Sequence, residues 1–133
     1  MKIYYNILDK LKINLTVTEN TYSLDPEALF QVGARINPKR SFLFISKIIG
    51  KHLRINPDNM FVSGKLLGLL YYKKMYKTEE FDCLIHNYAS YINGLCDYKP
   101  AGSISLPKKT LFIGFAETAT GIASSVFSLF GEN

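Results

Sequence analysis

The chain has little cysteine: Cys83 and Cys96 are the only two in 133 residues. They do not form a C-x-x-C pair, and no histidine lies at a metal-ligand offset from either of them. The sequence therefore predicts neither a zinc site nor a dithiol redox centre. A disulfide between the two stays open as an alternative, but we expect free thiols and a cytoplasmic protein.

Long apolar runs, repeats and low-complexity stretches are also missing. The N-terminus lacks the apolar core of a signal peptide, and no apolar run approaches the ~20 residues that span a bilayer. Apolar residues make up 47% of the chain and charged residues 20%, which is a globular composition. We expect a single domain over residues 1–133 with no membrane partner.

Two common nucleotide-binding motifs are absent. There is no G-x-G-x-x-G dinucleotide fingerprint, and Ser63-Gly64-Lys65 lacks the earlier glycine and the preceding strand of a phosphate loop. His52 and His86 have no carboxylate or cysteine at catalytic spacing, so we interpret both as structural or surface residues.

The charge is basic, with 16 Lys and Arg against 11 Asp and Glu, giving a net charge of +5. Such a balance permits a phosphate, a nucleic acid or a membrane surface as partner and does not choose among them. The densest basic stretch is also rich in aliphatic residues, so we expect no nucleic-acid role.

Local patterns predict an early β piece followed by helices. Residues 3–7 are apolar and aromatic, and Ile13, Leu15 and Val17 alternate with polar residues as in a half-buried strand. Asp25 before Pro26 predicts the start of a short helix, and Asn56 before Pro57 the start of a longer one that ends near residue 76. A further helix is expected over residues 79–93, capped by Thr78 and followed by Gly94.

Residues 41–53 have the period of an amphipathic helix. At 100° per residue, Ile45, Ile48 and Ile49 fall on an apolar side that we expect to be buried. Lys47 and Lys51 fall on the opposite side, four residues apart, where they can converge on one anion. The basic set that we consider for anion binding adds three residues of the preceding loop and comprises Arg35, Lys39, Arg40, Lys47 and Lys51. By pattern alone, a solvated face over a packed helix explains these residues better.

The most informative stretch is the apolar run of residues 110–115 (TLFIGF). It predicts a central strand buried on both faces, as in a parallel sheet. Small polar residues (AETATG) and a helix over residues 122–130 follow it. A strand, a tight turn and a helix form the local architecture in which helix N-termini bind phosphates.

The candidate phosphate-binding residues are those of this turn: Glu117, Thr118, Ala119, Thr120 and Gly121. Backbone N–H groups at the start of the next helix lack intrahelical partners, and the two threonines add hydroxyl donors. Glu117 suits a hydroxyl or a metal-bound water better than an anion. From spacing alone, a plain strand-to-helix turn with Thr118 or Thr120 as N-cap is the stronger interpretation.

Two segments, ARINPKRSFLFISKIIGKH and IGFAETATG, occur in an order that resembles the phosphoribosyltransferase-like proteins of bacterial tellurite-resistance and stress operons. The resemblance runs roughly from Tyr22 to the end of the chain. It implies an α/β fold in which a parallel sheet is flanked by helices. It also implies 5-phosphoribosyl 1-pyrophosphate (PRPP) as substrate with Mg²⁺, pyrophosphate contacts at residues 117–121, and transfer of phosphoribosyl between pyrophosphate and a nitrogenous base.

The sequence departs from that family at the ribose-phosphate loop, which in the family has adjacent acidic residues followed by Thr-Thr-Gly or Ser-Thr-Gly. Here the TATG of residues 118–121 follows Phe115 and Ala116. We therefore expect a domain that is incomplete at its C-terminus and inactive by itself, with a partner chain or a second copy completing the sheet. The alternative is a non-catalytic phosphate-binding, nucleotide-binding or regulatory module of the same fold.

Overall fold

The computed structural model describes residues 1–37, 39–97, 102–116 and 119–131. It begins with an antiparallel hairpin of β1 (Lys2–Ile7) and β2 (Leu11–Thr16), in which Tyr5 lies opposite Ile13. The hairpin confirms the two early strands that the sequence predicts. Alternation places Ile13 on the buried face at 8% exposure, and Asn6 Nδ2 donates to Asp9 Oδ1 (2.9 Å) at the turn.

A second antiparallel hairpin follows the short helix α1 (Pro26–Leu29), whose cap Asp25 accepts a hydrogen bond from Glu27 N–H (3.0 Å) as expected. It consists of β3 (Phe30–Ala34) and β4 (Phe42–Ser46). The helix predicted over residues 41–53 is therefore wrong. The apolar stripe also fits a strand, and Phe44 pairs with Val32 in register and packs its ring against Phe30 at 5.3 Å. Cross-strand pairing of this kind outweighs a local helical period.

This correction changes the surroundings of the lysines and isoleucines of this segment. Lys47 is half-buried, and its Nζ donates to the backbone oxygen of Glu27 (2.7 Å), whereas Lys51 is exposed as predicted. Ile45, Ile48 and Ile49 are only partly buried. The two lysines do not share a helical face, so the predicted reason for their convergence no longer holds.

The remaining helices agree with the sequence apart from their first residues. Helix α2 (Pro57–Tyr76) starts at the predicted cap, where Asn56 Oδ1 accepts from Asp58 N–H (3.0 Å). Helix α3 (Asp82–Ile92) starts later than predicted, after Phe81 and without a side-chain cap, so the predicted cap Thr78 is wrong. The helix is followed by Gly94 at φ +71°. Helix α4 (Ala119–Leu129) starts slightly earlier than predicted. Among the described residues no helix is long and apolar enough to cross a membrane.

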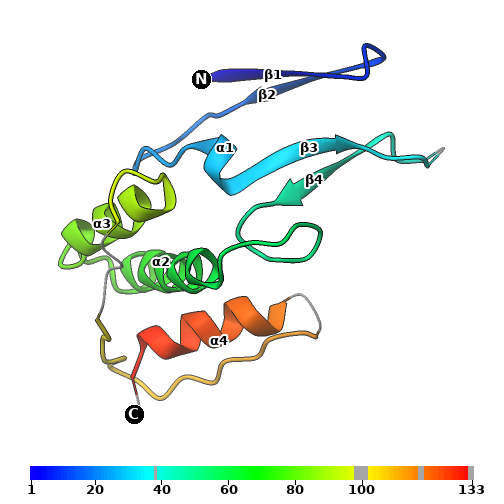
Figure 1. Cartoon of the computed structure of the whole chain (residues 1–133). Coiled ribbons are helices and arrows are strands. Elements are labelled where there is room, and N and C mark those ends of the chain that lie inside the picture. Colours follow the sequence, from blue (N-terminus) through cyan, green and yellow to red (C-terminus); the bar gives the residue numbers. More distant parts are fainter. Residues whose placement is uncertain (38, 98–101, 117–118, 132–133) are drawn as a thin grey trace.

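The hydrophobic core lies among these helices and not between the strands. Figure 1 shows the two hairpins stacked on one side of the molecule, with α2 and α4 side by side on the other and α3 next to them. The buried cluster comes from α2, α3 and the end of α4, and consists of Val62, Leu66, Leu69, Ile85, Tyr88, Ile92, Leu129 and Phe130.

Helices α2 and α4 run parallel and touch through glycine. A Cβ atom on Gly64 would collide with the side chain of Ser125, and one on Gly68 would lie 2.8 Å from Leu129 Cδ2. Near the start of both helices, a Cβ on Gly121 would lie 2.8 Å from Met60 Sδ. The glycines of α2 thus allow a close approach to another helix, and that helix is α4.

Lys73 of α2 bonds Asp82 of α3 at 2.6 and 2.7 Å to the two carboxylate oxygens. The hydrogen bond to Asp82, and then the one to Tyr22, raises the pKa of Lys73 above its ordinary value. Because the folded pKa is raised, this stabilisation is complete below the unfolded pKa of about 10.4. It is lost as the pH rises through the still higher folded value.

The central strand predicted over residues 110–115 is not present. This segment runs antiparallel to α4, with Phe112 packed on Phe127 (5.6 Å) and Phe130 (5.4 Å). Leu111, Ile113 and Phe115 are 83%, 73% and 80% exposed. Within the described ranges there is no parallel sheet, and the observed fold is a mixed α/β arrangement with two small antiparallel sheets. A strand needs a hydrogen-bonded partner strand, and no described strand pairs with this segment.

The glycine contact gives a first prediction. Replacing Gly64 by valine should lower the free energy of unfolding by about 1–3 kcal/mol, because the added atoms force α2 and α4 apart. The matched control is Gly50→Ala, whose new Cβ meets Ile55 only at an ordinary 3.4 Å. Urea denaturation should place the control within about 0.5 kcal/mol of the unmodified chain. Equal effects of both changes would contradict the packing described here.

The segment that lies on α4 gives a second prediction. Phe112→Ala should lower the unfolding free energy by roughly 2–3 kcal/mol, less than the 3–5 typical of a fully buried phenylalanine. Ile113→Ala, one residue along and pointing outward, should change it by less than about 0.5 kcal/mol. Thermal and urea unfolding of the two variants measure this difference, and a reversed order would mean that the opposite face is packed.

Candidate functional site

The candidate turn overlaps the start of helix α4. Ala119, Thr120 and Gly121 form the first turn of that helix, whereas Glu117 and Thr118 lie outside the described residues. Thr120 is exposed, and the other two are half-buried. Because the first N–H groups of a helix have no partner within it, this turn offers donors to an oxygen-rich anion.

Helix α2 begins at the same end of the molecule. Met60, in its first turn, contacts Gly121 in the first turn of α4, while the later residues Gly68 and Leu129 meet further along. The positive ends of two helix dipoles therefore lie close together. Asp58 reduces the effect at α2, and the described part of the first turn of α4 contains no acidic residue.

The loop that enters α2 adds positive charge near this end. Lys51 and Arg54 are exposed in it, and Arg54 lies two residues before the cap Asn56. Arg54 was not among the candidates chosen from the sequence. The sequence could have indicated Arg54, because it stands just before a helix cap and such a residue must lie near the N-terminal end of the helix.

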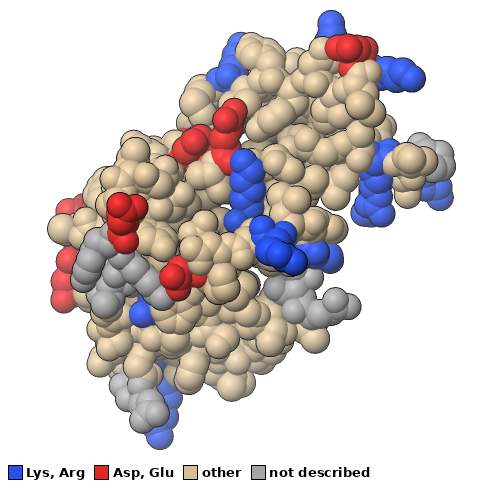
Figure 2. All heavy atoms as spheres, viewed as in Figure 1, with Lys and Arg blue, Asp and Glu red and all other residues tan. Residues whose placement is uncertain are grey.

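The other basic candidates lie elsewhere. Arg35, Lys39 and Arg40 are exposed at the connection between β3 and β4, where Lys39 N–H donates to Asn37 Oδ1 (2.8 Å). Figure 1 shows this hairpin projecting away from the helices. The space-filling view in Figure 2 shows Lys and Arg atoms over the hairpins and the loop, and Asp and Glu atoms mainly toward α3. The structure thus divides the five predicted residues into a hairpin group, Lys47 bonded to the backbone oxygen of Glu27, and Lys51 in the loop before α2.

The Ser63-Gly64-Lys65 segment and the two histidines considered in the sequence analysis do not form a binding or catalytic site. Gly64 lies within α2 as a helix contact, and the neighbouring Lys65 is buried at 8% exposure with its Nζ bonded to Gly102 O (3.1 Å). His86 packs its ring against Tyr22 at 5.2 Å, and His52 is exposed. The helical Gly64–Lys65 segment does not resemble a phosphate loop, and the surroundings of the two histidines do not resemble an acid–base pair.

A dedicated metal site is not visible in the parts of the chain that the structure describes. No group of three or more His, Cys, Asp or Glu side chains comes together there. The described residues therefore do not fit a protein-built Mg²⁺ site, and no chemical step is assigned to the metal.

Comparison with known proteins completes the description of the site. Residues 29–133 match the model of a family described as phosphoribosyl transferase, so the match starts at the end of α1 and includes the candidate turn. No curated protein and no solved structure matches the chain. A match over most of the chain shows that the chain belongs to the phosphoribosyltransferase family.

Proposed function

We propose that this chain supplies the pyrophosphate-binding part of a PRPP-dependent phosphoribosyltransferase, which moves phosphoribosyl between pyrophosphate and a nitrogenous base. The observation that supports this best is the common end of α2 and α4. Two helix N-termini lie there, and the exposed cations Lys51 and Arg54 stand in the loop that enters α2, in a chain of the phosphoribosyltransferase family.

In the proposed site, the leaving pyrophosphate is stabilised by backbone N–H groups at the start of α4 and by the Thr120 hydroxyl. These groups are fixed before the reaction, so they need little reorganisation as negative charge develops on the diphosphate. Lys51 adds a point charge in the preceding loop. Any Mg²⁺ is expected to be held by diphosphate oxygens, because the described residues form no carboxylate cluster.

The ribose and its 5-phosphate need a second site, for which no matching residues occur in this sequence. We propose that another segment or another chain supplies it and pairs with the segment at residues 110–115. The free outward face of that segment, with Leu111, Ile113 and Phe115 exposed, supports such a partner. The same face is compatible with the alternative function, a phosphate-binding or nucleotide-binding regulatory module that recruits a partner.

The biological setting is part of the proposal. The resemblance of two sequence segments to proteins of tellurite-resistance and stress operons supports a cytoplasmic enzyme of nucleotide metabolism within such a stress response.

The anion site gives a third prediction. Pyrophosphate added to the full chain should shift the amide resonances of Ala119, Thr120 and Gly121. Lys51→Met should weaken its binding about two- to fivefold, as expected for one exposed charge contact. The matched control is Lys108→Met, which removes an exposed charge beside the other end of α4. Equal weakening by both variants would indicate a general charge effect and no local site.

The missing second site gives a fourth prediction. The chain alone, incubated with labelled PRPP, Mg²⁺ and a panel of nitrogenous bases, should release no pyrophosphate in a base-dependent manner. Loss of substrate positioning forfeits on the order of 7–11 kcal/mol of barrier lowering. Base-dependent release that disappears in the double variant Glu117→Gln, Thr120→Ala would show instead that the chain holds a complete active site.

A further inference from the structure

A cleft of about 710 Å³ opens between the N-terminal hairpin and the second sheet. One wall comes from β1, β2 and the residues that follow, and includes Ile3, Leu15 and Val17. The opposite wall includes Leu29, Phe30 and Phe44. The first wall precedes residue 29, where the family match begins, and the opposite wall lies within the matched residues.

The polar groups around the cleft are largely engaged already. The Asn20 side chain bonds both backbone groups of Leu24 (2.8 and 2.9 Å), and Glu19 accepts from the Thr21 hydroxyl (3.2 Å). Ser46 Oγ accepts from Ile48 N–H (3.1 Å), which leaves its own proton available to donate. A ligand rich in polar groups would lose hydrogen bonds with water here and find few replacements.

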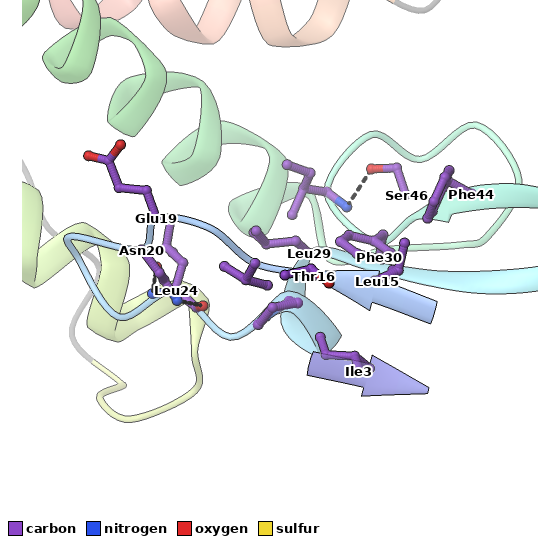
Figure 3. Close-up of a pocket in the computed structure, with 13 residues that line it drawn as sticks. Ile3, Leu15, Thr16, Glu19, Asn20, Leu24, Leu29, Phe30, Phe44 and Ser46 are labelled. Atoms are coloured by element: carbon purple, nitrogen blue, oxygen red, sulfur yellow. Dashed lines mark hydrogen bonds between the residues drawn. The ribbon is translucent and has the colours of Figure 1, made fainter. Parts of the chain in front are cut away.

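The charge of the lining also restricts the ligand. Among the residues that the structure describes, no lysine or arginine lines the cleft, and Glu19 is the one ionisable side chain in its lining. Figure 3 shows Glu19 at one end, Phe44 and Ser46 at the opposite end, and Leu15, Leu29 and Phe30 between them. The lining therefore disfavours an anion, and the hydroxyls of Ser46 and Thr16 provide too few contacts to recognise the polar edge of a nucleobase.

We propose that this cleft binds an uncharged, mainly apolar ring compound with one hydrogen-bond acceptor at its Phe44–Ser46 end. A volume of several hundred Å³ with apolar walls and few polar groups is usual for small-molecule sites. Phe44 is 50% exposed and meets Phe30 edge to face at 5.3 Å, so a ring bound beside this pair gains aromatic contacts. The acceptor atom of the ligand takes the proton of the Ser46 hydroxyl.

The probe for the test is Nile red, an uncharged fused-ring dye that bears a carbonyl acceptor. Titration of the full chain should raise and blue-shift its emission in a saturable manner. Ile48→Trp, which fills the cleft from the end of β4, should weaken binding at least about tenfold. Ile113→Ser is the matched control, because it removes an exposed apolar side chain from the segment that lies on α4, and it should leave the affinity unchanged.

A second measurement guards against misfolding of the Ile48→Trp chain. Amide resonances of the unmodified chain, recorded with and without coumarin, should shift at Leu15, Val17, Phe44 and Ile48. Absence of saturable dye binding, loss of binding in Ile113→Ser, or shifts confined to other regions would each overturn the proposal. So would a dimer, measured by light scattering, that becomes a monomer in Ile48→Trp, since a second copy would then fill the cleft. None of these readouts depends on phosphoribosyl transfer.

Discussion

The contact between α2 and α4 is the constraint on which much of the structure depends. Because Gly64 and Gly68 carry no side chain, the two helices approach closely enough for Leu129 and Phe130 to enter the core formed by α2 and α3. Phe130 in turn supports Phe112, so the segment that leads to the candidate turn is also held through this contact. The parallel arrangement follows from the same pairing and brings the two helix N-termini together.

Sequence reasoning succeeded where a signal is local. The caps Asp25 and Asn56 act through their own neighbouring amides, and the alternation in residues 11–17 is a property of one strand. It failed at residues 42–46, where a run of consecutive apolar residues fits either a helix or a strand and the pairing with β3 decides. It also failed at residues 110–115, because burial on both faces requires neighbouring strands that no described segment supplies.

The candidate site divides in the same way. A helix near the turn could be predicted from small residues that follow an apolar run, although α4 begins within the turn at Ala119 and not after it at residue 122. The predicted convergence of Lys47 and Lys51 on one anion was wrong, because it depended on a helix that is absent. Lys47 Nζ instead donates to the backbone oxygen of Glu27. The proximity of the α2 N-terminus to this turn results from tertiary packing, which neither local sequence reveals. Arg54 becomes a candidate only because of that proximity.

The parallel helices have a consequence for how fast an anion arrives. With both dipoles oriented the same way and exposed cations in the preceding loop, the electric field at this end extends into solvent and draws diphosphate-like molecules toward it. Such long-range attraction acts on the encounter rate more than on the lifetime of the complex. At physiological ionic strength it reaches only about 8 Å, so dissolved salt slows the approach of the anion while leaving short-range contacts in the complex much less affected.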